Sequence, residues 1–125
     1  METVDLSSKR LGPASAIVIA KCLEGKSALT SLNLQVNKIG PTGATALAEA
    51  LKVSSALKNL DLSDNNLTNS GEDMSGVLAI ADALKPGTSA VIKLNISNNN
   101  ITDDAKQALQ SAAASHRQPS LELVL

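Results

Sequence analysis

The sequence predicts an α/β solenoid in which short parallel strands alternate with helices, and three observations support this prediction. An 11-residue pattern of aliphatic residues and one asparagine recurs along the chain. Between its copies lie segments whose apolar residues have the i, i+3, i+4, i+7 spacing of one helix face. The chain contains no Phe, Tyr or Trp, so its core needs many small aliphatic contacts, which a stack of thin repeats supplies.

The recurring pattern is L-x-x-L-x-L-x-x-N-x-L, with Ile or Val at some leucine positions. Three copies match it throughout and begin at Leu29, Leu57 and Val91. A weaker copy begins at Met1, and a truncated one, counted from Gln118, contains Leu121 and Leu123. The starting positions give periods of 28, 28, 34 and 27 residues. We therefore expect a single domain over residues 1–125, with repeats at about 1–28, 29–56, 57–90 and 91–117 and a terminal strand at 118–125.

Each copy of the pattern predicts a short strand, because alternating side chains of a strand point to opposite faces. The inward pairs are Leu32/Leu34, Leu60/Leu62 and Leu94/Ile96. Parallel neighbours need crossovers of about a dozen residues or more, usually helical. The segments between the copies are long enough for such crossovers, so the strands are expected to stack side by side in one parallel sheet.

The crossovers carry helix signals. Gly12-Pro13 and Gly40-Pro41 open the first two, since proline is tolerated in a first helical turn, and Lys85-Pro86-Gly87 ends the third. Asp103 and Asp104 predict the acidic first turn of the last helix. Each helix has a stripe expected to be buried: Ser15, Val18, Ile19, Cys22 and Leu23; Gly43, Ala46, Leu47, Ala50 and Leu51; Gly76, Ala79, Ile80, Ala83 and Leu84; Ala105, Ala108, Leu109, Ala112 and Ala113.

An asparagine occupies the same position in three copies, where the chain leaves the strand. These residues are Asn37, Asn65 and Asn99. Backbone groups at such a turn lose their sheet partners, and an amide side chain can both donate to them and accept from them. We predict a structural ladder of three aligned asparagines. Lys9 holds the equivalent first position and cannot accept a hydrogen bond, so we expect a looser first coil.

The pattern, followed by the segment IGPTGATALAEAL from Ile39 to Leu51, resembles the ribonuclease-inhibitor type of leucine-rich repeat. Similar repeats occur in NOD-like receptors and in GTPase-activating proteins for Ran. The resemblance implies a leucine-rich repeat solenoid, a right-handed β-α superhelix with parallel strands on the concave face and helices on the convex face. It also implies protein binding through the concave face and its rim loops. This chain is shorter than those relatives, has Lys9 in place of asparagine, and has a longer third repeat.

Outward strand positions supply the first candidate binding residues. One column reads Asp5, Asn33, Asp61, Asn95 and Glu122; the next reads Ser7, Gln35, Ser63, Ser97 and Val124; a third includes Thr3, Ser31, Asn59, Lys93 and Ser120. We predict partner binding by Asp5, Asn33, Gln35, Asp61, Ser63, Lys93, Asn95 and Ser97. The alternative is a merely solvated sheet face. Because Trp, Tyr and Arg, the residues typical of binding hot spots, are absent from these columns, we expect weak binding.

The longer third repeat supplies the second candidate site. Its extra residues lie between Asn69 and Ser75, and we predict partner contacts by Glu72, Asp73 and an exposed Met74, since loops of repeat scaffolds often bind. The alternative is a tolerated insertion, because lengthening a surface loop costs little. In that case Asp73 or Ser75 caps the following helix.

Composition argues against several other functions. The formal charge of −1 and the absence of aromatic residues disfavour nucleic-acid binding. No apolar run is long enough for a membrane helix, and Met1 opens no secretory signal. Cys22 is expected to be a small buried hydrophobe, and His116 to lie at a helix C-terminus, where a cation suits the dipole. One Cys and one His give no metal-site spacing, so we expect neither a metal nor a cofactor. Without a disulfide we expect an intracellular, cytoplasmic protein.

Three functional hypotheses follow. The first is a non-catalytic protein-interaction or scaffold module. The second is a GTPase-activating or other regulatory protein, suggested by the resemblance to the Ran activators. The third is a structural piece of a longer solenoid that self-associates, because uncapped ends of a parallel sheet expose unpaired backbone groups. The identity of the protein partner is not encoded in any motif.

Overall fold

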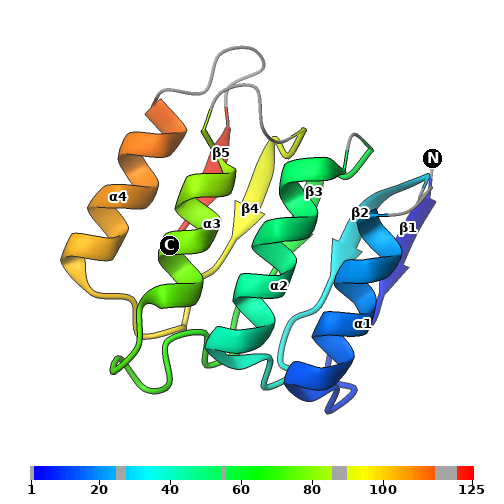
Figure 1. Ribbon diagram of the computed structural model, residues 1–125, viewed down its shortest axis with the longest axis horizontal. Helices are drawn as coiled ribbons and strands as arrows, with labels where there is room; N and C mark the ends of the chain where they lie inside the picture. The colour runs from blue at the N-terminus through cyan, green and yellow to red at the C-terminus, as the bar shows by residue number, and fades with distance from the viewer. Residues whose placement is uncertain (1, 25–27, 55, 86–89, 115–120) are drawn as a thin grey trace.

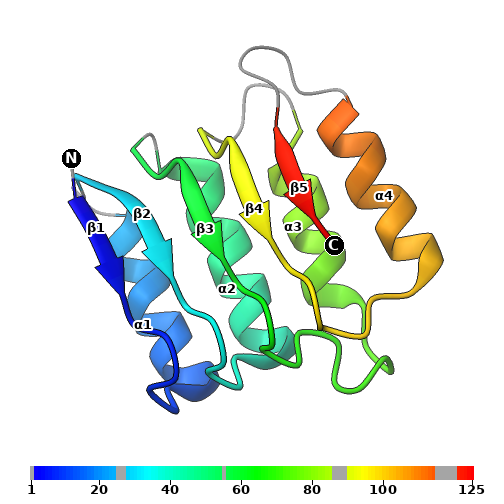
Figure 2. The same ribbon diagram turned by 180° about the vertical axis from the view of Figure 1, so that it is seen from behind.

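The computed structural model describes residues 2–24, 28–54, 56–85, 90–114 and 121–125, which form one open sheet covered on one face by a row of helices (Figure 1). Figure 2 shows the opposite side, where the strands face the viewer without a covering layer. The strands are β1 Glu2–Asp5, β2 Leu29–Asn33, β3 Asn59–Asp61, β4 Lys93–Asn95 and β5 Glu122–Val124. The helices are α1 Gly12–Glu24, α2 Gly40–Val53, α3 Ser75–Ala83 and α4 Asp103–Ala114.

All neighbouring strands of the described chain are parallel, and the sheet order is β1-β2-β3-β4-β5. Val4 lies opposite Leu32, Leu32 opposite Leu60, and Leu60 opposite Leu94. The predicted register of the copies that begin at 1, 29, 57 and 91 is therefore confirmed. Consecutive strands are neighbours in space, so each helix is the crossover of one coil.

The predicted register of the terminal strand is wrong by two residues. Asn95 lies opposite Val124, not Glu122, and Glu122 lies opposite Lys93. A shift of two keeps every side chain on its predicted face, because the period of a strand is two. In the observed register Lys93 and Glu122 form an ion pair, with their charged atoms 4.0 Å apart. Residues 118–120, assigned to this strand from the sequence, lie outside the described residues.

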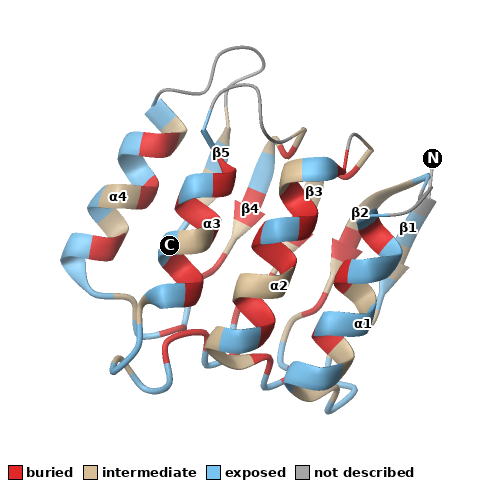
Figure 3. Ribbon diagram, in the orientation of Figure 1, coloured by how far each residue is buried: buried red, intermediate tan, exposed pale blue. Residues whose placement is uncertain are grey.

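The core lies between the sheet and the helices. Leu34, Leu62 and Ile96 are completely buried, as are the helix residues Leu47 and Ile80. Figure 3 shows buried positions along the helices where they face the sheet and their neighbours. Fully burying one such aliphatic side chain contributes about 1.5–3 kcal/mol. Repetition of this small contribution replaces the large aromatic anchors that the sequence lacks.

Neighbouring helices approach each other closely at glycines. A Cβ atom added to Gly76 of α3 would lie 2.7 Å from the Cβ of Ala44 on α2. One added to Gly43 of α2 would lie 3.0 Å from the Cβ of Ala16 on α1. Gly43 and Gly76 thus face the preceding helix of the stack, while Ala16 and Ala44 face the following one.

This arrangement corrects the predicted stripe of the first helix. Val18 is 64% exposed and Cys22 is also exposed, whereas Ala16 and Ala20, outside the predicted stripe, are buried; Leu23 is buried as predicted. The predicted stripe is the side that in α2 and α3 faces the preceding helix. Helix α1 has no preceding helix within the described chain, so that side lies in solvent. Cys22 is therefore not a core residue.

The turns from strand to helix repeat one backbone conformation. Two residues in each turn, separated by one residue, have positive φ: Ser8 and Arg10, Val36 and Lys38, Asp64 and Asn66, Asn98 and Asn100. Left-handed conformation is costly for residues other than Gly, Asn and Asp. The third and fourth turns use Asn and Asp, which tolerate it, while the second turn places a β-branched valine there.

Candidate functional site

The three aligned asparagines lie in a continuous ladder beneath the strand-to-helix turns. The side-chain oxygen of Asn65 accepts hydrogen bonds from the backbone N–H groups of Asn37 at 2.8 Å and Ile39 at 3.4 Å. Its amide nitrogen donates to the carbonyl of Leu34 at 2.8 Å. Asn99 repeats the pattern one coil further on, accepting from Asn65 at 2.8 Å and Leu67 at 3.1 Å.

Asn37 makes the same contacts with the first coil. Its oxygen accepts from the backbone of Lys9 at 2.8 Å and Leu11 at 3.3 Å, and its amide donates to the Leu6 carbonyl at 2.8 Å. Lys9 therefore joins the ladder through its main chain, while its side chain is exposed. Each asparagine bridges two coils, so these bonds fix the position of one turn relative to the next.

The sheet face opposite the helices, which we name the open strand face, has a shallow hollow of about 400 Å³. Its lining includes Ser31, Leu32, Asn59 and Leu60. Four predicted binding residues meet there, from three successive strands: Asn33, Asp61, Lys93 and Asn95. Asp5, Gln35, Ser63 and Ser97 are not among the residues that line it.

The polar side chains of this face are held in place by bonds two residues along the chain. Asp61 accepts from the Ser63 backbone at 2.9 Å and from its hydroxyl at 2.7 Å, and Ser63 is buried. Asn95 bonds Ser97 in the same way, at 3.0 and 2.8 Å. Asn33 accepts from the backbone of Gln35 at 2.9 Å. In the first coil, Asp5 accepts from the backbone and the hydroxyl of Ser7 in the same way. The bond from the Ser7 hydroxyl holds the pKa of Asp5 below its usual value.

The long loop of the third coil is pinned to the next turn through Thr68. The buried Thr68 hydroxyl donates to the carbonyl of Asn99 at 2.6 Å and accepts from the backbone of Gly71 at 2.9 Å. The backbone of Ser70 donates to the Asn66 side chain at 2.8 Å. The insertion is thus an ordered loop with its own internal hydrogen bonds.

Two of the three predicted loop contacts lie at the surface. Glu72 and Asp73 are exposed, but Met74 is half-buried and packs against the core, so its predicted exposure is wrong. Asp73 accepts from the backbone of Ser75 at 2.9 Å, at the start of α3. The hydroxyl of Ser75 lowers the pKa of Asp73. The N-cap of α3 is nevertheless Met74, without a side-chain cap, so the predicted capping by Asp73 or Ser75 is wrong, and Asp73 only accepts a hydrogen bond from the first residue of the helix.

Groups for other chemistry are sparse in the described part of the chain. Its His, Cys, Asp and Glu residues include no cluster of three that could hold a metal ion. Cys22 is exposed on α1, and the predicted position of His116 lies outside the described residues. No helix among these residues has both the length and the apolar character needed to cross a bilayer.

A family model described as Leucine Rich repeat matches residues 26–48, 53–71 and 91–109. Each matched segment contains one of the strands β2, β3 and β4 and the asparagine turn that follows it. These strands are adjacent and parallel, with their asparagines in one ladder. The fold is a leucine-rich repeat solenoid. A comparison with curated proteins finds no match to this sequence.

Leucine-rich repeats are commonly protein–protein interaction modules and are generally not enzymes. This agrees with the general class predicted from the sequence. The matched segments include every residue of the open strand face that comes from β2, β3 and β4. The family assignment therefore covers the surface on which four predicted binding residues meet.

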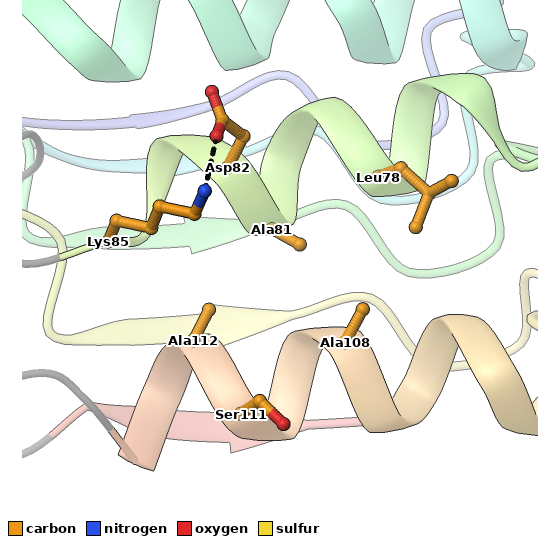
Figure 4. Close-up of a pocket in the computed structure, with 7 residues that line it drawn as sticks. All are labelled: Leu78, Ala81, Asp82, Lys85, Ala108, Ser111 and Ala112. Carbon is orange, nitrogen blue, oxygen red and sulfur yellow. Dashed lines mark ion pairs between the residues drawn. The ribbon is translucent and has the colours of Figure 1, made fainter.

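Sequence reasoning missed a second hollow of this leucine-rich repeat chain, on its helical side. A groove of about 590 Å³ lies between α3 and α4, with Leu78, Ala81 and Asp82 on one wall and Ala108 and Ala112 on the other (Figure 4). The ion pair of Asp82 with Lys85, 2.9 Å long, lies at its border. The groove forms because α4 presents alanines where larger residues would fill the space. The run of alanines in residues 105–114 is the sequence signal for it.

Proposed function

We propose that this chain is a non-catalytic interaction module that binds a protein partner through its open strand face, the face expected to be concave, and its strand-to-helix loops. The observation that supports this proposal is the hollow over the central strands. Asn33, Asp61, Lys93 and Asn95 meet there from three consecutive coils. They offer donors, acceptors and both signs of charge, which suits a polar protein segment.

The hydrogen bonds on this face support the same proposal. Because Asp61 is bonded to Ser63 and Asn95 to Ser97, both side chains are ordered before a partner arrives. Pre-ordering lowers the entropic cost of binding. No aromatic residue is available as an anchor anywhere in the chain, so we expect modest affinity that benefits from several simultaneous contacts.

A matched pair of substitutions tests this proposal. Asn59→Arg places a long cation in the hollow, whereas Gln110→Arg adds the same side chain to an exposed position of α4 on the helical side. After cross-linking in a cell extract, we expect proteins captured by the parent to be lost with Asn59→Arg and retained with Gln110→Arg. Equal capture by the two variants would exclude the open strand face as the binding surface.

Regulation of a small GTPase is the alternative activity. The proposed assignment to the ribonuclease-inhibitor type, supported by the 28-residue spacing of the first coils and by helices of 13 and 14 residues, is its main basis. A GTP-hydrolysis assay with a panel of small GTPases separates it from simple binding. Acceleration of hydrolysis by this chain would replace the non-catalytic proposal.

We also propose that the chain self-associates through the ends of the stack and that it is intracellular. Strands β1 and β5 are the outer strands of the described sheet, and Val18 and Cys22 of the first helix, α1, are exposed. Exposed strand edges favour pairing with another chain. An exposed thiol without a disulfide fits a reducing compartment.

A further inference from the structure

The edge of the molecule where strands end and helices begin carries a distinctive charge pattern. We name it the strand-to-helix rim and define it as residues 6–12, 34–41, 62–75 and 96–104, along the lower edge of Figure 1. Every residue of the rim is described by the structure. The ladder of asparagines and the bonds of Thr68 hold its four turns in fixed relative positions.

The charges of the rim are separated by sign. Its first two segments contain the cations Lys9, Arg10 and Lys38 and no carboxylate. Its last two segments contain only carboxylates, from Asp64, Glu72, Asp73, Asp103 and Asp104. All eight side chains are exposed. The half-buried Lys106 lies just beyond the rim in α4 and offsets only part of the negative charge.

None of these eight side chains forms an ion pair within the described chain, although Lys9 lies close enough to Asp5, just before the rim, to help the hydroxyl of Ser7 lower the pKa of that carboxyl. The ion pairs of the described chain involve Lys21, Lys52, Lys85 and Lys93, all of them outside the rim. Helices α1 and α2 also begin at the basic half without an acidic residue in their first turns. Their positive dipole ends therefore add to the positive charge of Lys9, Arg10 and Lys38. Within the rim itself, carboxylates lie only in the acidic half, so the basic half has no carboxylate among its own residues.

The middle of the rim combines charged and apolar side chains, and its charged residues are Lys38, Asp64, Glu72 and Asp73. A hollow of about 420 Å³ beside it is lined by Ile17, Pro41 and Ala46 and by the polar residues Thr42, Thr45, Asp73 and Ser75. Ile17 is 38% exposed, and Val36, in the adjoining turn of the second coil, is 45% exposed. Ile17 and Val36 therefore add exposed apolar area near the charged residues, and protein–protein interfaces combine both kinds of contact.

We propose that two copies of this chain associate rim to rim and antiparallel, about a two-fold axis between the second and third coils. The rim is self-complementary under that operation, because the basic half of each copy then faces the acidic half of the other. Lys9 and Arg10 oppose Asp103 and Asp104 of the second copy, and each such contact occurs twice. The open strand faces stay free in this dimer, so the partner proposed above binds the dimer through that face, while the strand-to-helix loops contact the second copy.

Such a dimer depends on exposed charges, so it is weak and sensitive to salt. The screening length of water falls from about 10 Å at about 0.1 M salt to about 3 Å at about 1 M. We expect the dissociation constant of the dimer to rise at least about tenfold between about 20 mM and about 500 mM NaCl. Sedimentation equilibrium of the full chain over a wide concentration range measures it.

Two charge-reversed variants provide the decisive test. Lys9→Glu/Arg10→Glu makes both ends of the rim acidic, and Asp103→Lys/Asp104→Lys makes both ends basic. Each variant alone faces its own repulsion, so we expect at least about tenfold weaker self-association. An equimolar mixture restores both attractive contacts, so it should form a heterodimer within about threefold of the parent affinity. A nonspecific attraction between oppositely charged variants gives no reason for the affinity of the mixture to match the parent affinity within about threefold.

A milder pair guards against loss of folding, which circular dichroism checks. Lys38→Glu and Glu72→Lys reverse one basic and one acidic charge nearer the axis and leave the first turn of α4 intact. They are measured alone and as a mixture in the same way. Asn59→Arg, on the open strand face, should leave the dimer unchanged, so the dimer and the partner proposal can fail separately.

Four results would overturn the proposal. One is a parent that stays monomeric at low salt and high concentration. Another is self-association of the reversed variants equal to that of the parent, without preference for the mixture. The third is an open-ended series of oligomers that ignores the reversals, which would assign association to the edges of β1 and β5. The fourth is a parent chain that is monomeric but captures a foreign protein through these charges, because the rim would then bind that protein and not a second copy.

Discussion

Single residues in the strand-to-helix turns have to meet two demands at once. Some, such as Asn65, replace hydrogen bonds that the sheet no longer supplies, and others adopt left-handed backbone conformation so that the chain can turn. Stranding the buried partners of one ladder asparagine would cost about 1–3 kcal/mol for each group. The ladder therefore requires an asparagine at one buried position of a coil, whereas the positions with positive φ favour Asn or Asp and have them only in the third and fourth turns.

Val36 meets the second demand poorly, and this gives a prediction. It has φ of 58°, where the third and fourth turns have Asp64 and Asn98. Val36→Asn should raise the free energy of unfolding by about 1 kcal/mol, because asparagine tolerates the left-handed region and valine does not. Urea titration measures the change. Val53→Asn, at another exposed valine at the end of α2, should give no gain. A less stable Val36→Asn chain would show that the valine side chain contributes contacts that outweigh its strain.

At the scale of whole elements, close approach between helices determines how the coils stack. Gly76→Ala should destabilise the chain, because the new Cβ would lie 2.7 Å from both the Ala44 Cβ and the Pro41 carbonyl oxygen. Overpacking of this kind costs about 1–3 kcal/mol, and the better helix propensity of alanine returns about 1 kcal/mol. We expect a net loss of up to about 2 kcal/mol by urea titration. Gln110→Ala, at an exposed position of α4, should change stability by less than about 0.5 kcal/mol. Equal effects of Gly76→Ala and Gln110→Ala would refute the packing argument.

Elements differed in how well the sequence predicted them, and the reasons are physical. Strands β2, β3 and β4 and helix α2 have neighbours on both sides, so their periodic residues have one consistent burial. Helix α1 and strand β5 lie at the ends, where one side has no neighbour in the described chain and periodicity alone selects neither the side nor the register. The short spacing between Leu121, Leu123 and Leu125 allows two registers with the same inward face.

The candidate site was predicted in part for similar reasons. Outward columns are readable from the sequence once the register is known, so Asn33, Asp61, Lys93 and Asn95 could be assigned to one face. The half-burial of Met74 could not, because it depends on how the inserted loop folds back through Thr68. The rim charges were visible in the sequence, but their alignment along one edge appears only when the four turns are stacked.

For the whole molecule, the charged groups whose pKa is shifted predict how stability depends on pH. The side chain of Lys85, followed by that of Lys52, lowers the pKa of Asp82 from 3.8, and Ser7 and Ser75 lower those of Asp5 and Asp73. A carboxyl with a lowered folded pKa stabilises the folded chain above its unfolded pKa, and this stabilisation is lost as the pH falls through the folded pKa. The hydrogen bond to Asp82 raises the pKa of Lys52 from 10.5. The stabilisation by this lysine is therefore complete below pH 10.5 and is lost as the pH rises through the raised pKa.

The free energy of unfolding should therefore be nearly constant between about pH 5 and about pH 9, and decrease below 3.8 as these carboxyls gain protons in the folded state. Lys52 Nζ lies 3.1 Å from Asp82 Oδ2, so this pair ties α2 to α3. Asp82→Asn removes one of the three shifted carboxyls and should lose less stability on acidification than the parent, in urea titrations at several pH values. Gln107→Asn, at an exposed and uncharged position of α4, should follow the parent curve. A parent whose stability rises on acidification below 3.8 would mean that relief of repulsion among the rim carboxylates outweighs the loss of these three contacts.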